Sequence, residues 1–189
     1  IIKHDRTIQQ GSFKLEEGFE LKGKTLGIIG VGSIGSALAT MANGIGMNII
    51  GYNHSPKNVQ RIAMKNSLDE LLAEADAISL HVTHKEENKH LISNEQIKKM
   101  KDGVIVVNVA DRECVDERAM AEALQSEKVF EYAYEGEDLL HTPLAGSENA
   151  LGLKFFGWYT KEAVATFKKV WVDNIESMAK GQPQNTVKE

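Results

Sequence analysis

Cysteine is almost absent from this sequence, and the one residue present, Cys114, excludes an internal disulfide. We therefore expect a reducing compartment, the cytoplasm. Basic residues are not in excess, because 22 Lys and Arg stand against 27 Asp and Glu, for a net charge of −5. This balance argues against nucleic acid or an anionic membrane surface as a partner. No apolar run approaches the roughly 20 residues of a membrane span, and the six histidines are too scattered to predict a metal site.

What the sequence does contain is a regular alternation of short apolar runs and helical patterns. Predicted strands lie at residues 25–30, 48–53, 77–82, 103–109 and 129–135, and predicted helices at 33–46, 67–75, 93–100, 116–126 and 160–181. Ser67 with Glu70, and Ser93 with Gln96, have the spacing of a capping box. Apolar strands that each precede a helix are typical of parallel strands covered on both faces. The sequence therefore predicts a three-layer, doubly wound α/β fold.

The segment GVGSIG, residues 30–35, sits between the first predicted strand and the first predicted helix. In that context Gly30 permits a tight turn, Gly32 lets the backbone approach a pyrophosphate, and Gly35 lets helix and strand pack closely. The N-terminus of the helix offers N–H groups and partial positive charge to the phosphates. We predict a Rossmann-type site in which Gly30, Gly32, Ser33, Ile34 and Gly35 hold the pyrophosphate of a dinucleotide. The alternative is a tight turn that binds nothing.

The next predicted strand ends where NAD-binding domains usually carry an acidic residue for the adenosine ribose. This sequence has Asn53 there, followed by His54, Ser55 and Lys57. Asn53 can bond a ribose without repelling a phosphate, and the other three side chains can hold a 2′-phosphate through charge-assisted hydrogen bonds. We predict NADP or NAD as the cofactor, with a slight preference for NADP. A solvated turn with an N-capping serine is the alternative interpretation of the segment.

Four longer segments, taken with these motifs, resemble the D-isomer-specific 2-hydroxyacid dehydrogenases. They are LKGKTLGIIGVGSIGSALA, ISLHVTHKEENKHLISNEQIKKMKDGVIVVNVA, VDERAMAEALQS and DNIESMAKGQPQN. The resemblance implies hydride transfer between a nicotinamide cofactor and a small 2-hydroxy or 2-keto acid, and a homodimer formed through the cofactor domain. It also implies a single NAD(P)-binding domain over residues 1–189, with a core at about 20–160 and a long helix at about 160–181. The family's substrate domain is expected to lie outside this chain.

The resemblance further implies which residues line the nicotinamide side of the site. They are His81, Val82, Val109, Ala110, Asp111 and Glu135.

The catalytic positions implied by the resemblance depart from the family pattern. Asp111 occupies the position of the family's substrate-binding arginine, with Arg112 displaced by one, and Phe155 occupies that of the proton-transferring histidine. The remaining candidates for catalytic roles are Arg112, Glu137 and His141, with His81 or His84 as other relocated acids. Two readings stay open: an oxidoreductase with an atypical catalytic set, and an inactive dinucleotide-binding module that acts as a sensor or assembly partner.

Overall fold

A computed structural model describes residues 8–9, 11, 18–55, 58–137, 140–155 and 157–186. The chain divides into two compact units, Ile1–Leu153 and Lys154–Glu189. The first unit contains the sheet and the glycine turn, and the second contains a long helix.

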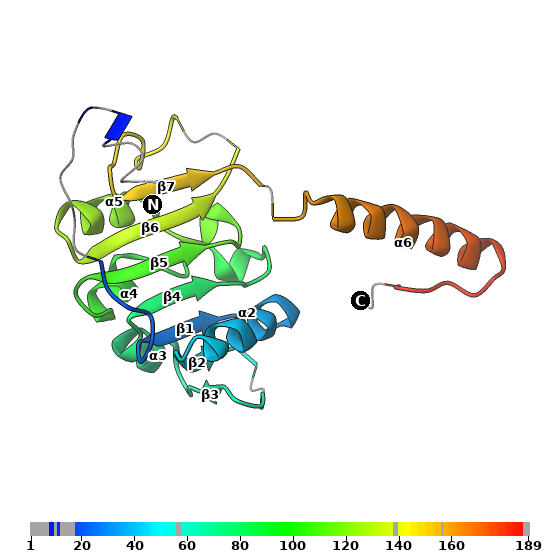
Figure 1. The fold of residues 1–189 in the computed structure, drawn as a ribbon, viewed down its shortest axis with the longest axis horizontal. Coiled ribbons are helices and arrows are strands. Elements are labelled where there is room, and N and C mark those ends of the chain that lie inside the picture. Colours follow the sequence, from blue (N-terminus) through cyan, green and yellow to red (C-terminus); the bar gives the residue numbers. More distant parts are fainter. Residues whose placement is uncertain are drawn as a thin grey trace. The chain divides into compact units, whose positions relative to one another are not determined.

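The first unit is built on a seven-stranded sheet in which every neighbouring pair is parallel. The spatial order is β3-β2-β1-β4-β5-β6-β7, and Figure 1 shows the strand arrows pointing the same way. The strands are β1 (Thr25–Ile29), β2 (Asn48–Tyr52), β3 (Ala63–Met64), β4 (Ala77–Leu80), β5 (Val104–Asn108), β6 (Val129–Glu135) and β7 (Ala150–Leu153). Along the chain, β1, β2 and β3 extend the sheet in one direction, and β4 to β7 extend it in the other. This arrangement confirms the predicted doubly wound fold.

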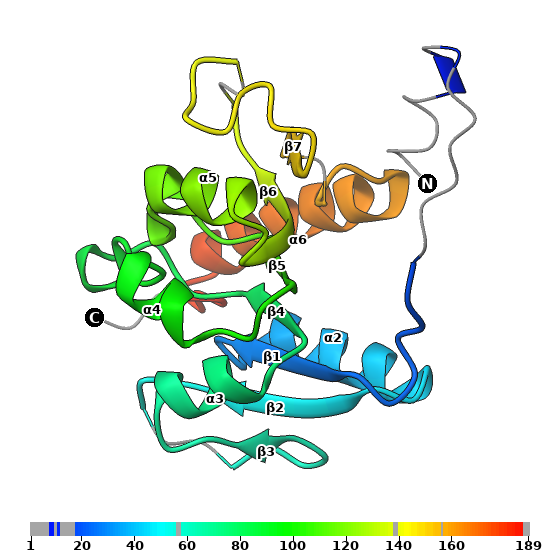
Figure 2. The same cartoon turned by 90° about the vertical axis from the view of Figure 1, so that its left-hand side faces the viewer.

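Helices cover both faces of this sheet. The helix α2 (Ser33–Gly44) lies on one face, and α3 (Leu68–Glu74), α4 (Asn94–Lys99) and α5 (Glu117–Gln125) lie on the other (Figure 2). Two buried apolar clusters fill the space between the layers. Strand β1 contributes to both, because Leu26 and Ile28 belong to the cluster that includes α2, and Ile29 belongs to the larger one. A strand buried on both faces explains why its sequence lacks polar alternation.

Side-chain caps fix where the short helices begin. Ser93 and Gln96 form the predicted capping box at α4. At α3 the Ser67 hydroxyl accepts from the backbone N–H of Glu70 at 3.2 Å. The Glu70 carboxylate, however, accepts from the N–H of Asn66 at 3.1 Å, one residue before the cap. The box spacing therefore located the helix start correctly, although the return bond at α3 goes to a neighbouring donor.

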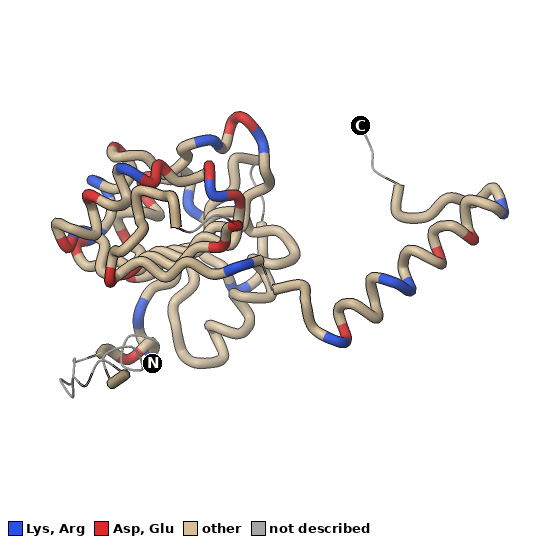
Figure 3. The backbone as a smooth tube through the Cα atoms, turned by 90° about the horizontal axis from the view of Figure 1, so that it is seen from above, with Lys and Arg blue, Asp and Glu red and all other residues tan. Residues whose placement is uncertain are grey.

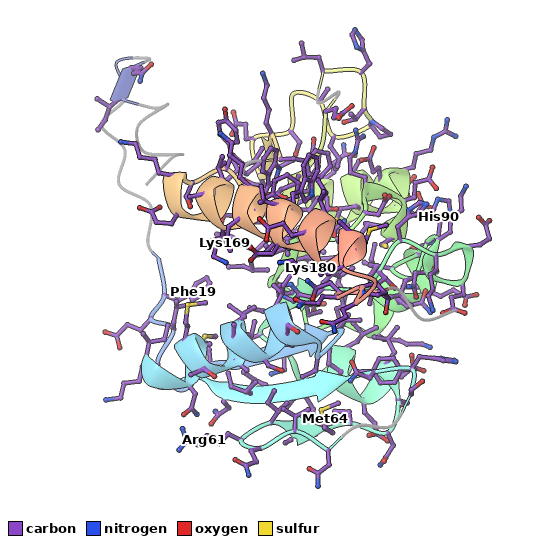
Figure 4. The ribbon with its side chains drawn as sticks, turned by 90° about the vertical axis from the view of Figure 1, so that its right-hand side faces the viewer. Phe19, Arg61, Met64, His90, Lys169 and Lys180 are labelled. Atoms are coloured by element: carbon purple, nitrogen blue, oxygen red, sulfur yellow. The ribbon has the colours of Figure 1, made fainter. Side chains whose placement is uncertain are left out.

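Two strands escaped prediction, and both lie at the edges of the sheet. Strand β3 has only two residues, and it follows Arg61, whose φ is +63° (Arg61 and Met64 are labelled in Figure 4). Strand β7 pairs with β6 from Tyr132↔Ala150 to Glu135↔Leu153. Its four residues include Gly152, and none of them is fully buried. Short, half-buried strands carry too little apolar signal for a sequence pattern to reveal them.

The second unit contains α6 (Lys161–Ala179), which begins where the Thr160 hydroxyl accepts from the N–H of Ala163. Basic and acidic residues are interspersed along its backbone, as they are along the first unit (Figure 3). Its large apolar side chains are exposed, among them Phe167, Trp171, Ile175 and Met178. None of the helices formed by described residues combines the length and apolarity needed to cross a membrane.

Candidate functional site

The site lies at the carboxyl ends of β1, β2 and β4, where the direction of winding reverses. In open α/β sheets this reversal leaves a crevice outside the strand ends, because the connecting chains depart to opposite faces. A cavity of about 410 Å³ occupies that place. Its volume lies within the range of small-ligand sites, roughly 300–1,000 Å³.

The glycine turn forms the floor of the cavity, and each glycine meets a different steric constraint. Gly30 has φ +94°, and a Cβ there would lie 2.7 Å from the carbonyl carbon and oxygen of His81. A Cβ on Gly35 would lie 2.6 Å from the Gly30 oxygen. A Cβ on Gly32, by contrast, would meet nothing within 4 Å. The first and third glycines are therefore required by the fold, whereas the second keeps open a space that the protein itself does not use.

The first turn of α2 faces this space with its backbone donors free of side-chain caps. Gly32 is the N-cap residue and has no side chain to accept from the turn, and the first turn contains no acidic residue. Helix N-termini leave N–H groups without intrahelical partners and carry partial positive charge. Ser33, Ile34 and Gly35 thus form an anion-binding helix end directly after Gly32. They are not among the residues that line the cavity, and Ile34 is 70% exposed.

Asn53 ties the end of β2 to the glycine turn. Its Oδ1 accepts from the N–H of Val31 at 2.6 Å, so its Nδ2 is the atom with donors to offer a ligand. His54 and Ser55 follow it, are exposed, and line the same cavity. Lys57, predicted to act with them, lies outside the described residues.

Seven of the predicted cofactor residues line this one cavity. They are Gly30, Gly32, Asn53, His54, Ser55, His81 and Val82. The cavity is completed by side chains that the sequence did not single out as ligand-binding. They are Tyr52, Thr83, Lys85, Glu87, Asn88 and Leu91, with Ile29 and Val31 from β1 and its turn. Most of the additional residues belong to the long connection after β4, which has no motif of its own to mark it.

His81 is held at the back of the cavity in its uncharged form. Its Nε2 lies 2.9 Å from the Ser79 hydroxyl, while its Nδ1 is buried and has no hydrogen-bond partner among the described residues. Burial lowers the pKa of the His81 imidazole below its ordinary value. A buried polar atom without a partner is costly in a protein interior, so Nδ1 is positioned for a group that a ligand would bring. Together with the open space at Gly32, this atom shows that the residues present fit a dinucleotide.

The loop after β5 is fixed by a buried amide. Asn108 is fully buried, its Oδ1 accepts from the N–H of Ala110 at 3.0 Å, and its Nδ2 donates to the Asp111 carbonyl at 3.1 Å. The Asp111 carboxylate caps the 3₁₀ turn η2 (Arg112–Cys114) and lies 2.9 Å from Nδ1 of His84. Val109 is 44% exposed. Ala110, Asp111 and, at the end of β6, Glu135 are partly exposed.

The predicted catalytic candidates do not meet at one point. The Arg112 guanidinium contacts Glu117, with its Nε at 2.8 Å and an Nη at 2.7 Å, and lies over the ring of Tyr134. Glu137 and His141 are exposed residues beyond β6. Phe155 is 46% exposed and belongs to the second unit. Among the described residues, no group of three or more His, Cys, Asp or Glu side chains is arranged to hold a metal ion.

Fold and site together define a dinucleotide-binding α/β domain. The family model "D-isomer specific 2-hydroxyacid dehydrogenase, NAD binding domain" matches residues 1–153, and the chain belongs to this family. The resemblance inferred from the motifs is thereby confirmed.

Individual relatives agree with this assignment. The chain is 36% identical to a D-3-phosphoglycerate dehydrogenase of Archaeoglobus fulgidus, over 97% of this chain and 36% of the relative. It is 38% identical to a hydroxypyruvate reductase of Thermotoga maritima, over 88% of this chain and 56% of the relative. A solved acyclic imino acid reductase in complex with NADPH and D-Arg superposes with a TM-score of 0.91 at 26% identity, over 99% of this chain and 62% of that one. The chain thus spans between a third and two thirds of the length of these proteins.

The lowered pKa of His81 predicts a specific dependence of stability on pH. The unfolded chain takes up a proton on this residue near 6.5, and the folded chain does so only at lower pH. Between those two values the unfolded state binds more protons, so the free energy of unfolding decreases as pH falls from about 6.5 through the folded-state pKa. Urea unfolding at pH about 7.5 and about 5.5 should show a larger loss for the wild type than for His81→Gln. Equal losses in the two proteins would contradict this assignment.

Proposed function

We propose that this chain is the cofactor-binding part of an NAD(P)-dependent oxidoreductase that transfers a hydride between nicotinamide and a 2-hydroxy or 2-keto acid. The observation that carries the proposal is the glycine turn, in which Gly30 and Gly35 are sterically enforced while Gly32 faces open space. The substrate class follows from the named activities of the relatives, a phosphoglycerate dehydrogenase and a hydroxypyruvate reductase.

Different residues along the crevice bind different parts of the cofactor. The N–H groups of Ser33, Ile34 and Gly35 bind the pyrophosphate, and Asn53 holds the adenosine ribose through Nδ2. Val82 and Ala110 lie at the start of the loops after β4 and β5, the two loops that flank the nicotinamide side. The cofactor, when bound, supplies the hydride. The protein orients the ring and excludes water from one side of it.

NADP is favoured over NAD by the chemistry around Asn53. An amide there donates to a 2′-phosphate, whereas the acidic residue usual in NAD-binding domains repels one. His54 and Ser55 are exposed beside it and provide further donors. Both cofactors occur among proteins of this fold, NADPH in the acyclic imino acid reductase and NAD in a D-lactate dehydrogenase from Aquifex aeolicus, so the preference proposed here depends on the residues around Asn53.

The assembly follows from the same assignment. We propose that residues 1–189 form one cofactor-binding domain within a longer protein whose substrate domain lies outside this chain. A homodimer is supported by the exposed apolar side chains of α6, Phe167, Trp171, Ile175 and Met178, which recur three or four residues apart. Contiguous apolar surface of this kind marks contact surfaces between proteins.

A dinucleotide-binding module without turnover is the second candidate. Asp111 and Phe155 favour it, because neither side chain can perform the role that the family assigns to its position. This second function would be selected if the full-length protein bound the reduced cofactor but did not oxidise it with any 2-keto acid.

The proposal is tested by titrating the chain with NADH and NADPH while following tryptophan fluorescence and heat of binding. The substitution Gly32→Ala should weaken binding at least about tenfold, or about 1.4 kcal/mol, because its Cβ occupies the space needed by the pyrophosphate. Its thermal stability should stay within about 1 kcal/mol of wild type, since Gly32 is an extended N-cap residue.

The matched variant Gly35→Ala separates binding from folding. Its Cβ would meet the Gly30 oxygen at 2.6 Å, so we expect a loss of stability of about 1–3 kcal/mol. If wild type binds neither cofactor, or if Gly32→Ala binds as tightly as wild type, the proposed cofactor site is wrong.

The preference between cofactors is tested by Asn53→Asp. Aspartate keeps the oxygen that accepts from Val31 but adds a negative charge where a 2′-phosphate would lie. We expect NADPH affinity to fall at least about tenfold while NADH affinity is maintained. Asn48→Asp, at the opposite end of the same strand, adds the same charge away from the cavity and should change neither affinity. An equal effect of Asn53→Asp on both cofactors would argue against 2′-phosphate recognition at this position.

A further inference from the structure

A histidine and a carboxylate meet beside the crevice, from loops that follow adjacent strands. His84 lies in the connection after β4, between Thr83 and Lys85, both of which line the cavity. Its Nδ1 is 2.9 Å from Oδ2 of Asp111, in the loop after β5. The His84 side chain is 72% exposed, so its other ring nitrogen, Nε2, is accessible from solvent.

Asp111 is held more firmly than the carboxylate of an ordinary surface ion pair. Its Oδ1 accepts from the N–H of Glu113 at 2.8 Å, and its backbone carbonyl accepts from Cys114 at 3.1 Å and from the buried Asn108 amide at 3.1 Å. Exposed ion pairs between mobile side chains contribute little to stability. A residue held by these three hydrogen bonds, one on its carboxylate and two on its backbone carbonyl, instead orients the imidazole that it binds, as supporting hydrogen bonds do around functional groups.

Two other described groups near this pair, His81 and Arg112, are less suited to donate a proton to a substrate. His81 is half-buried, its Nε2 lies against Ser79, and burial lowers its pKa, which favours the uncharged form. The Arg112 guanidinium contacts Glu117. His84 therefore combines exposure, a fixed carboxylate and a location between the two loops that flank the nicotinamide side.

We propose that His84, oriented by Asp111, is the proton donor to the substrate's carbonyl oxygen. This inference rests on the proposed function. If the bound cofactor delivered a hydride to the carbonyl carbon, the carbonyl π electrons would take a proton from Nε2 of protonated His84. The product is a hydroxyl group, the oxidised cofactor and a neutral imidazole that regains a proton from water. Asp111 acts through His84 and is a positioning residue.

The position of Asp111 also affects how the site can bind the carboxylate of a substrate. Asp111 places a carboxylate where the family pattern has a guanidinium, and the His84 ring lies against that carboxylate. Other charged residues on the two loops are Lys85 and Glu87, which pair with each other, Glu113, which pairs with Lys89, and Arg112. A substrate carboxylate must therefore be bound by groups other than residue 111.

The inference is tested by NMR of the isotope-labelled full chain with NADH or NADPH bound. We expect a nuclear Overhauser contact between the His84 ring and the nicotinamide C4 proton, assigned with His84→Gln. In Asp111→Asn the ring loses its fixed acceptor at Nδ1, so the contact should weaken or vanish while the cofactor stays bound. A structural ion pair alone would give no contact with the nicotinamide in any of these proteins.

Hydride transfer to glyoxylate and hydroxypyruvate by the full-length protein provides the second readout. His84→Gln should slow the oxidation of bound reduced cofactor at least about 100-fold, the usual contribution of a general acid, with an unchanged Kd for the cofactor. The control is His90→Asn, which removes an exposed histidine six residues along the chain (labelled in Figure 4). Asparagine tolerates the positive φ of 50° at this residue, so both readouts should match wild type.

The outcomes separate this inference from the proposed function. Failure of wild type to bind either cofactor overturns both. Cofactor binding without a contact between His84 and the nicotinamide overturns only the role of His84, and this contact requires no turnover. A wild-type rate in His84→Gln overturns it as well.

Discussion

The close approach of the β1 turn to the backbone that leaves β4 determines the rest of the site. Gly30 has no Cβ, and the chain at His81 passes through the space that a Cβ would fill. The N–H of His81 donates to the Ile29 carbonyl at 2.7 Å, and that of Gly30 donates to the Tyr52 carbonyl at 2.9 Å. Three strand ends are thereby held around one turn. The crevice, the orientation of α2 and the position of Asn53 all follow from this contact.

The cofactor end of the crevice is determined mainly by the backbone, and the substrate end mainly by side chains. A pyrophosphate is bound by N–H groups, which any residue at positions 33 and 34 supplies equally well. Proton transfer, by contrast, depends on the identity and protonation of individual side chains. This difference explains how a chain can keep a complete glycine turn while Asp111 and Phe155 depart from the family pattern.

The fold could be predicted from the sequence wherever burial was strong. Strands β1, β2, β4, β5 and β6 were found because their apolar runs are buried on one or both faces. Strands β3 and β7 were missed because edge strands bury little. At the site, the glycine spacing pointed to Gly30 and Gly32, the end of the second strand to Asn53 and the family resemblance to His81, and these four residues line one cavity. It did not reveal that Asn53 bonds to Val31 or that His84 meets Asp111, because these contacts join segments at least 22 residues apart.

Asn108 shows how a buried polar residue of the fold can control the chemistry at the surface. It is fully buried at the end of β5, and both ends of its amide are used to shape the loop that follows. Leaving either end unpaired would cost about 1–3 kcal/mol, so the loop has little freedom to move. The Asp111 carboxylate is consequently fixed relative to the sheet. Because β4 pairs with β5 through Leu80↔Asn108, the loop that carries His84 departs from the adjacent strand end. The spacing of the histidine and the carboxylate is thus set by sheet register as well as by their mutual attraction.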